Sequence, residues 1–328
     1  MNSFWQNLAS SGPIIALAPM DGYTDSAYRQ IVKYVNPNVI CFTEFFSADG
    51  IVNSKFLAKS VLPHSKIEKP LIVQLFGKNP EIFKEAAIIA EGFGVAGIDV
   101  NMGCPAKKVV KSGHGSSLMI NIDTAYKIIE EMSKAVKIPI SVKTRLGFDD
   151  DKNLIEFAKG LENAGASLIT VHGRTYKQGF GGKADFKPIY ELKKYLKIPV
   201  LGNGDIQNID DGMKKMIIDK TNSQFSALKS QFLLDGFMIG RASFGNPWCF
   251  LPGNYRPTFK EILKMMERHA KLLVKTKGEK KGCLEIRKHL VQYLHDFEGA
   301  KNFRKQLVTV ESLDDVKKVL KEIGKILN

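Results

Sequence analysis

Short apolar runs alternate with longer amphipathic stretches along most of this chain. Eight runs contain few polar residues: 14–18, 39–43, 71–76, 97–100, 140–143, 168–172, 199–202 and 236–240. Such runs predict strands that are buried on both faces, as in a parallel sheet. Stretches with helical spacing lie between them, at 81–91, 124–136, 153–164 and 189–196. The alternation predicts an α/β fold, a (β/α)8 TIM barrel, with a doubly wound open sheet as the alternative.

The pattern changes after about residue 245. Proline and glycine gather between residues 245 and 258, which is typical of a linker. Beyond it the spacing is helical, at 259–275, 283–297, 303–309 and 313–326. We therefore expect two domains, a catalytic barrel over residues 1–250 and a small all-α C-terminal domain over residues 251–328.

Composition restricts the class of protein. The 328 residues are 44% hydrophobic and 25% charged, which is typical of a soluble globular protein. We find no apolar stretch long enough for a membrane span and no signal peptide at the start. Four cysteines lie far apart, without metal-ligand spacing, so neither disulfides nor a metal site are expected. These features predict a cytoplasmic protein with no membrane partner.

The net charge of +14 is unevenly distributed. Residues 255–328 hold 18 Lys and Arg against 10 Asp and Glu, so the tail carries a net +8 over 74 residues. Basic asymmetry of this kind favours a polyanionic partner, most often a nucleic acid. The alternative is a surface whose charge serves only solubility.

Cys104 is the candidate with the most direct chemistry. It lies in Asn101-Met102-Gly103-Cys104-Pro105, directly after the apolar run 97–100. The carboxyl ends of parallel strands are where catalytic groups gather in α/β folds. A thiol at that position can act as a nucleophile or as a proton donor. A buried cysteine that serves only packing is the alternative.

The other predicted strand ends also carry polar and glycine residues. They are Pro19, Met20 and Asp21 after the first run, Gln74 in the third, Asn101 in the fourth, Lys143 and Arg145 in the fifth, His172 and Arg174 in the sixth, Asn203, Gly204 and Asp205 in the seventh, and Gly240 and Arg241 in the eighth. Barrels often bind phosphate after strands seven and eight. A phosphate and one planar polar ring account for the whole set, and flavin mononucleotide (FMN) is such a ligand. Lys143 would then stabilise negative charge on the reduced ring, although a structural salt bridge is its alternative.

Other histidines give no such signal. His64, His269, His289 and His295 are expected to be ordinary surface or helix residues. No Gly-x-Gly-x-x-Gly follows the first predicted strand, so a Rossmann dinucleotide site has no support.

Several segments, in order, resemble the tRNA-dihydrouridine synthases, flavin enzymes that reduce specific uridines in tRNA. The resemblance covers about residues 13–250, and its most specific segment is Asn-x-Gly-Cys-Pro at 101–105. The others are Ala18-Pro19-Met20, Gln74-Leu75-Phe76-Gly77, Val142-Lys143-Thr144-Arg145, Val171-His172-Gly173-Arg174-Thr175, Gly202-Asn203-Gly204-Asp205 and Met238-Ile239-Gly240-Arg241. The basic tail is similar to that family's tRNA-binding domain in position and character.

The resemblance implies a role for each matching residue. Cys104 would donate a proton, and Asn101, Arg145 and Arg174 would orient the uridine. The residues implied to bind FMN are Pro19, Met20, Asp21, Gln74, Lys143, His172, Asn203, Gly204, Asp205, Gly240 and Arg241. One departure is the long polar stretch 219–234 before the eighth run.

The implied reaction delivers hydride from reduced FMN to carbon 6 of uracil and a proton from Cys104 to carbon 5. NADPH or NADH would then reduce the flavin again, and a monomer is expected to act on the tRNA. Two alternatives remain open. One is a small-molecule flavin barrel reductase of the dihydroorotate or dihydropyrimidine dehydrogenase type, and the other is a non-catalytic RNA-binding protein.

Overall fold

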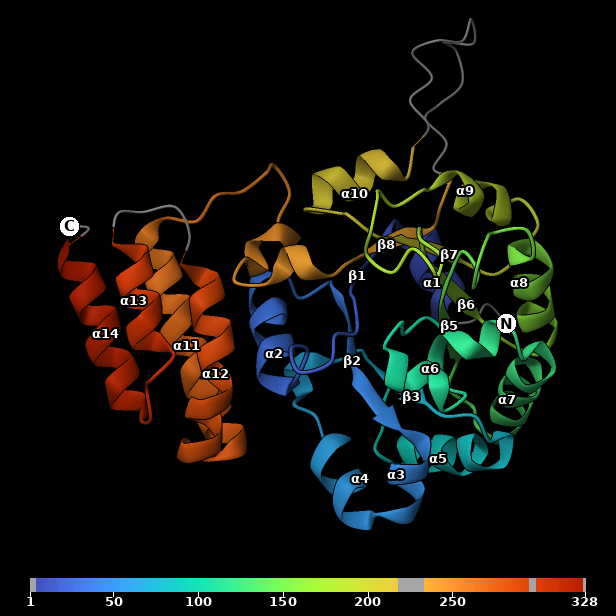
Figure 1. The fold of residues 1–328 in the computed structure, drawn as a ribbon, viewed down its shortest axis with the longest axis horizontal. Helices are drawn as coiled ribbons and strands as arrows, with labels where there is room; N and C mark the ends of the chain where they lie inside the picture. Colours follow the sequence, from blue (N-terminus) through green and yellow to red (C-terminus); the bar gives the residue numbers. More distant parts are fainter. Residues whose placement is uncertain (1–3, 218–232, 295–298, 327–328) are drawn as a thin grey trace, which may run out of the picture.

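Eight parallel strands close into a barrel, each beside the strand that follows it in sequence (Figure 1). The computed structural model describes residues 4–217, 233–294 and 299–326. The strands are β1 (Ile14–Leu17), β2 (Ile40–Ser47), β3 (Leu71–Phe76), β4 (Gly97–Asn101), β5 (Ile140–Arg145), β6 (Leu168–His172), β7 (Val200–Asn203) and β8 (Gly236–Ile239). Because β8 pairs with β1, the predicted TIM barrel is confirmed and the open-sheet alternative is wrong.

The strands are apolar on both faces because each face is buried against a different core. Inside the barrel, Phe42, Leu201 and Met238 belong to one cluster, which Trp5 of α1 (Phe4–Ser11) joins by stacking on Phe42 at 6.2 Å between ring centroids. Outside, alternate residues such as Val73 and Val142 pack in the cluster that the surrounding helices share. Period-2 alternation thus directs apolar side chains to both cores.

Strand β2 differs from the expectation. It runs to Ser47, beyond the predicted end at Thr43, because its register with β3 shifts between Phe42 and Phe45. Such an irregularity lets a strand bend without ending. Glu44 and Phe45 therefore lie within the strand, and Phe45 reaches the barrel's mouth.

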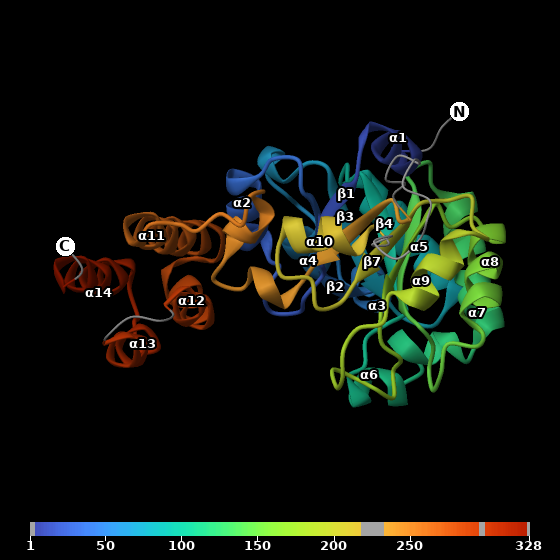
Figure 2. The same cartoon turned by 90° about the horizontal axis from the view of Figure 1, so that it is seen from above.

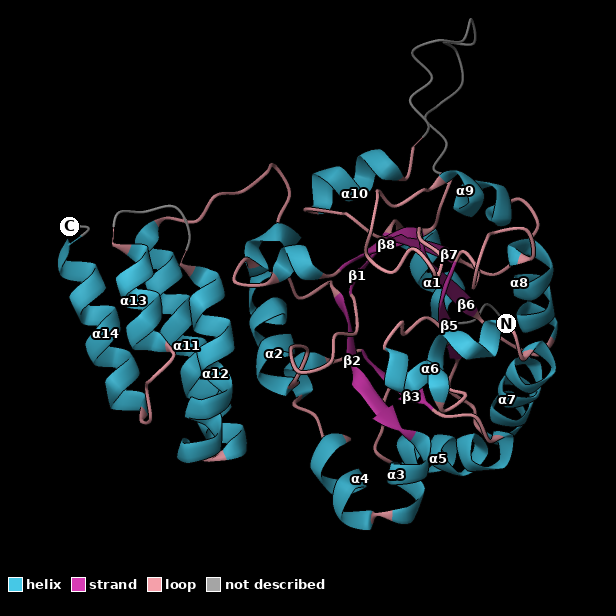
Figure 3. Cartoon of the chain, in the orientation of Figure 1, coloured by secondary structure: helices cyan, strands magenta, loops and turns pink. Residues whose placement is uncertain are grey.

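Helices surround the barrel and short helices cover its ends (Figure 3). Their bounds are α2 (Ser26–Val35), α3 (Ala48–Asn53), α4 (Lys55–Val61), η1 (Lys66–Glu68), α5 (Pro80–Gly92), α6 (Lys107–Lys111), η2 (Gly115–Met119), α7 (Ile122–Ala135), α8 (Leu154–Asn163), α9 (Lys187–Lys193), α10 (Ile209–Lys215), η3 (Arg241–Ser243) and η4 (Pro247–Phe250). Helix α9 begins two residues before its predicted start because Pro188 occupies its first turn.

Four helices form the C-terminal tail, as the sequence predicts: α11 (Phe259–Lys277), α12 (Glu279–Tyr293), α13 (Ala300–Leu307) and α14 (Leu313–Ile326). Thr258 and Glu261 form a capping box that starts α11, and Gly278, at φ 79°, turns the chain into α12. Figure 2 shows α12 and α13 on the side of the tail where α6 and the barrel's mouth lie. The long stretch 219–234 lies outside the described residues except for its last two positions.

The tail packs against α2 beside the barrel (Figure 1). Ala27 and Ile31 of α2 share an apolar cluster with Met266 and Leu290 of the tail. His269 lies in α11 and His289 in α12, in line with the expectation of ordinary surface or helix residues, and both side chains are buried. The division into domains at residue 250 stays a prediction, since Trp248 also joins the tail's cluster. His295 lies outside the described residues.

No helix within the described ranges combines the length and apolarity needed to cross a bilayer.

Candidate active site

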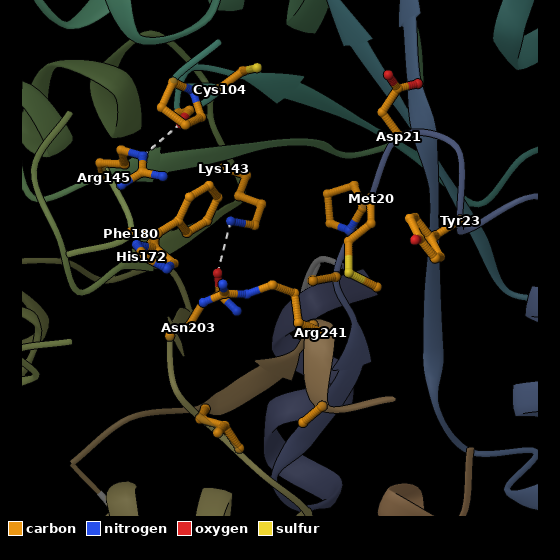
Figure 4. Close-up of a pocket in the computed structure, with 18 of the residues that line it drawn as sticks. Met20, Asp21, Tyr23, Cys104, Lys143, Arg145, His172, Phe180, Asn203 and Arg241 are labelled. Carbon is orange, nitrogen blue, oxygen red and sulfur yellow. Dashed lines mark hydrogen bonds between the residues drawn. The ribbon is translucent and has the colours of Figure 1, made fainter. Parts of the chain in front are cut away.

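A cavity of about 630 Å³ opens where the strands end at their carboxyl termini (Figure 4). This volume is within the range of small-molecule and cofactor sites. The structure brings together at this cavity the predicted residues Pro19, Met20, Asp21, Asn101, Cys104, Lys143, Arg145, His172, Asn203, Gly204, Asp205, Gly240 and Arg241. Gln74 and Arg174 are not among the described residues that line it. Residues from distant parts of the sequence thus meet because the barrel closes.

The loop that carries Cys104 is held on both sides. The Asn101 side-chain oxygen accepts hydrogen bonds from the amides of Gly103 at 3.1 Å and of Cys104 at 2.9 Å. The Ser116 hydroxyl donates to the Cys104 carbonyl at 3.0 Å. Figure 4 shows the sulfur at the rim of the pocket, directed toward the side where Asp21 lies. The thiol therefore has a defined position on the cavity wall.

Burial raises the pKa of the half-buried Cys104 thiol above its ordinary value, against the opposing effects of the Ala106 amide and of the Arg145 cation. The thiol is then protonated at neutral pH. A protonated thiol is a proton donor, whereas a nucleophilic cysteine needs its thiolate. The local electrostatics therefore favour the role of proton donor over that of nucleophile.

A buried chain of hydrogen bonds between β3, β4 and β5 supports the Cys104 loop from within the barrel. The Ser141 hydroxyl donates to Asp99 at 2.6 Å, and the Gln74 amide donates to the other Asp99 oxygen at 2.7 Å. The Asn101 amide then donates to the Gln74 oxygen at 2.9 Å. Burial raises the pKa of Asp99 to about 6. Gln74 thus supports the side chain of Asn101. The contact with flavin expected of Gln74 stays a prediction.

We expect Asn101→Ala to lower turnover about tenfold and to lower the free energy of unfolding by about 1–3 kcal/mol. The reason is that two loop amides lose their acceptor while Gln74 loses a donor. Steady-state kinetics and urea unfolding measure the two effects. Asn153→Ala is the matched control, because this exposed asparagine makes no side-chain cap at α8. Equal turnover in both variants would contradict a positioning role for Asn101.

Lys143 places a half-buried cation at the centre of the cavity (Figure 4). Its ammonium donates to the Asn203 side-chain oxygen at 3.0 Å (Figure 4). Burial and the neighbouring Arg145 lower the pKa of Lys143 to about 8. Within the described part of the chain no carboxylate lies within ion-pair distance of Lys143, so the structural salt bridge considered as its alternative has no partner there. A cation that is partly removed from water without an anion is costly, which favours an anionic ligand.

His172 adds a polar atom that no described group satisfies. Its Nδ1 is buried without a hydrogen-bond partner among the described residues. Burial, followed by the charge of Lys143, lowers the pKa of His172 to about 2, so the ring is neutral at pH 7. Gly204 faces the same ring at φ 118°, and a Cβ there would lie 2.7 Å from the Ala184 Cβ and 3.4 Å from His172 Nε2. Position 204 therefore requires glycine, because a side chain there would collide with Ala184.

Two arginines hold the loop that follows β6. The Arg174 guanidinium makes a bidentate ion pair with Asp205 at 2.6 and 3.0 Å and also donates to the carbonyls of Gly181 and Gly182. Arg145 donates to the Gly103 carbonyl at 2.8 Å and to two carbonyls of the loop. Arg174 is buried and fixes this loop instead of lining the cavity, so its contact with a substrate stays a prediction.

We expect Asp205→Ala to lower the free energy of unfolding by about 2 kcal/mol, because Arg174 loses its carboxylate while it stays buried. The value is below that of a fully buried pair because Asp205 is 34% exposed. Burial raises the pKa of Asp205, but the hydrogen bonds from Arg174 and from the Ala184 amide outweigh it and leave that pKa below its ordinary value. The stabilisation is therefore complete above about pH 4 and is lost as the pH falls through the lowered pKa.

Thermal unfolding of wild type and Asp205→Ala between pH 2 and pH 7 checks this expectation. The difference in Tm is expected to be constant near neutrality and to shrink in acid. Asp151→Ala, at an exposed carboxylate, is the control. A difference in Tm that grows on acidification would have the wrong sign for this ion pair.

Sequence reasoning missed the aromatic lining of the cavity. Tyr23, Phe45, Phe180 and Phe244 all line it. The Phe180 ring lies 4.6 Å from the Arg241 guanidinium and 5.6 Å from that of Arg145. Each of these aromatics is close in sequence to a strand end, and aromatic residues in strand-end loops were the signal that could have found them. The described residues contain no cluster of three or more His, Cys, Asp or Glu suited to a metal ion.

Comparisons with known proteins agree on one family. A family model described as dihydrouridine synthase (Dus) matches residues 16–327. A probable tRNA-dihydrouridine synthase 1 of Synechocystis sp. is 36% identical over 313 residues, which cover 92% of this chain and 84% of that protein. The tRNA-dihydrouridine synthase B of Pasteurella multocida is 34% identical over 300 residues, with coverages of 88% and 86%.

A solved structure shares the fold at much lower identity. It is a variant of NCR from Zymomonas mobilis, 15% identical, with a TM-score of 0.50 over 71% of this chain and 83% of that one.

Proposed function

Because this chain belongs to the dihydrouridine synthase family, we propose that it reduces specific uridines in tRNA to 5,6-dihydrouridine with the help of a flavin. The observation that carries the proposal is the position of the Cys104 thiol, on the wall of a cavity that also contains the cation of Lys143, which has no ion-pair partner among the described residues. An acid and a group that stabilises negative charge are what the reduction of an enone requires.

The cavity has the features that an anionic planar cofactor needs, which supports FMN as the flavin. The cation of Lys143 has no carboxylate partner among the described residues, and His172 Nδ1 is an orphaned polar atom. Gly204 lines the cavity with backbone atoms alone, and the exposed Arg241 makes no ion pair within the described ranges. We assign the ring to Pro19, Met20, Asp21, Gln74, Lys143 and His172, and the phosphate to Asn203, Gly204, Asp205, Gly240 and Arg241.

When bound, the reduced flavin supplies the hydride that carbon 6 of the uracil accepts. Cys104 holds a proton on its sulfur at neutral pH and delivers it to carbon 5, so that one hydride and one proton saturate the double bond. The Asn101 side chain orients the Cys104 loop by accepting a hydrogen bond from the Cys104 amide. Arg145 donates hydrogen bonds both to this loop and to the loop after β6. We propose that Asn101, Arg145 and Arg174 together orient the uridine. The spent flavin needs a nicotinamide reductant, for which we propose NADPH, with NADH as the alternative.

The basic tail supports tRNA as the substrate. Residues 255–328 carry a net +8, and two of their helices, α12 and α13, lie on the same side as α6 (Figure 2). Lysines and arginines on this side would bind phosphates and offset the cost of unstacking the target base. We propose that residues 1–250 form the FMN-binding unit and residues 251–328 the tRNA-binding unit. A monomer acting in the cytoplasm completes the proposal.

The two alternative functions predict different behaviour in solution. A small-molecule flavin reductase has no need of tRNA, so an absence of tRNA binding at 50 mM salt would favour it. A non-catalytic RNA-binding protein would be colourless and could not be reconstituted with FMN. The proposed enzyme is expected to be yellow, and its tRNA affinity is expected to fall steeply with salt.

The direct test of the proposed function is to map dihydrouridine in tRNA from a strain that lacks this protein. We expect the modification to disappear at one or more positions and to return when the wild-type gene is supplied. An unchanged map, or rescue without flavin binding, would contradict the proposal.

A further inference from the structure

Two aromatic rings stand where the barrel meets the tail. Tyr23 follows β1 and Phe244 follows η3, and their rings stack with centroids 3.9 Å apart at an interplanar angle of 18°. Both line the cavity described above. Figure 4 shows Tyr23 on the same side of the pocket as Asp21. The pair therefore forms the part of the cavity wall that is nearest to α12.

This pair differs from the aromatic core that joins the barrel to the tail. Tyr28, Tyr293 and His289 are buried there, and Tyr28 donates its hydroxyl proton to the Ser243 carbonyl. Tyr23 and Phe244 are only partly buried, although Tyr23 contacts the edge of His289 at 5.3 Å between centroids. Docking of the tail is thus provided by the buried rings, and it does not require two further aromatics with accessible surface in the cavity.

The turn that carries Tyr23 is fixed before any ligand binds. The Gly22 amide donates to Glu44 at 2.7 Å, and Gly22 adopts φ 73°. The Met20 amide donates to the Thr24 hydroxyl at 3.0 Å, and the Tyr23 amide donates to the Met20 carbonyl. A rigid aromatic surface loses little conformational entropy when a flat ligand packs on it.

Lys288 brings a cation from the tail to the same place. It lies on α12, and its Nζ is 5.4 Å from the Tyr23 ring centroid. The same Nζ is 3.5 Å from the point where a Cβ on Gly22 would lie. Lys288 is half-buried and has no ion-pair partner among the described residues. A cation next to an accessible aromatic pair suits one nucleotide, with its phosphate on the ammonium and its base or ribose on the rings.

We propose that Tyr23, Phe244 and Lys288 bind a nucleotide of the tRNA that neighbours the target uridine, on the side of the cavity that faces α12. This proposal rests on the proposed function. It extends that function by assigning a contact with the tRNA outside the reacting centre. Stacking does not distinguish the bases strongly, so the contact supports affinity and the register of the strand. Lys288 contributes one phosphate contact, which makes the binding of tRNA more dependent on the salt concentration.

The test uses the full-length holoenzyme and an unmodified tRNA transcript. Tyr23→Leu is expected to raise the KM for tRNA about tenfold, with little change in kcat, because it removes a stacking surface and leaves the reacting groups in place. Tyr23→Phe keeps the ring and is expected to restore the KM, since no hydrogen bond of the Tyr23 hydroxyl is present in the described part of the structure. Lys288→Gln is expected to reduce the slope of log K against log salt by about 1.

Lys137→Gln is the control for charge, because Lys137 is exposed in the loop before β5, at the end of the barrel away from the mouth. An inactive wild type would overturn the proposed function itself. An active wild type whose KM and salt slope are the same in Tyr23→Leu and Lys288→Gln would overturn only this inference. A fall in kcat without a change in KM would also overturn it, since the residue would then act on the chemistry.

Discussion

Cys104→Ala is expected to lower the reduction of uridine in tRNA by about 10²–10⁴-fold, while flavin content and tRNA affinity stay near their wild-type values. The variant removes the proposed acid from a loop that Asn101 and Ser116 continue to hold through backbone atoms. Burial raises the pKa of the thiol, so the wild-type activity that depends on the proton is retained at neutral pH and declines as the pH rises through that pKa. The variant is expected to lack this alkaline decline.

Steady-state turnover from pH 6 to pH 10 measures both effects. Cys249→Ala is the matched control, since this thiol is buried in η4 away from the cavity. Turnover near the wild-type value in Cys104→Ala at neutral pH would assign the proton to another group. Loss of flavin from the variant would instead point to a structural role for the loop.

Lys143→Ala is expected to weaken flavin retention or to slow hydride transfer by about 10²-fold. The substitution removes a half-buried cation from the cavity and leaves the Asn203 oxygen without its donor. Because burial lowers the pKa of Lys143 to about 8, the cation is present below that pH, and the wild-type affinity for FMN is expected to fall as the pH rises above it. Because a bound anion raises the pKa of Lys143 in the complex, the decline in affinity begins at about pH 8 and ends at that raised pKa.

Equilibrium dialysis against FMN and stopped-flow reduction of the bound flavin separate the two effects of Lys143→Ala. Lys33→Met is the control, because Lys33 is a buried lysine outside the cavity that donates to the Pro37 carbonyl beyond α2. Unchanged values for both measurements in Lys143→Ala would make Lys143 a structural residue.

The sequence predicted the barrel and the four tail helices because their signals are local. A run such as 71–76 has no polar face, and the tail helices have regular apolar spacing with a capping box at Thr258. The predicted strands also located their carboxyl ends, which meet at one end of a barrel. Cys104, Lys143 and Arg241 could therefore be assigned to one cavity from the sequence.

The contacts between distant segments could not be predicted in this way. The supporting chain through Ser141, Asp99, Gln74 and Asn101 depends on the register between three strands. The burial of His269 and His289 depends on how the tail packs on α2, which no local pattern states. The aromatic pair of Tyr23 and Phe244 unites residues more than 200 positions apart in the sequence. Each of these features arises from tertiary packing, where side-chain identity alone leaves many partners open.

A single-turnover experiment tests the central claim most directly. The flavin of the wild-type holoenzyme is reduced without oxygen, an unmodified tRNA transcript is added, and absorbance at about 450 nm is followed while dihydrouridine is measured by mass spectrometry. We predict that each flavin oxidised yields one dihydrouridine and that Cys104→Ala slows both signals together. A flavin that stays reduced in the presence of tRNA, or is oxidised without forming dihydrouridine, would contradict the account.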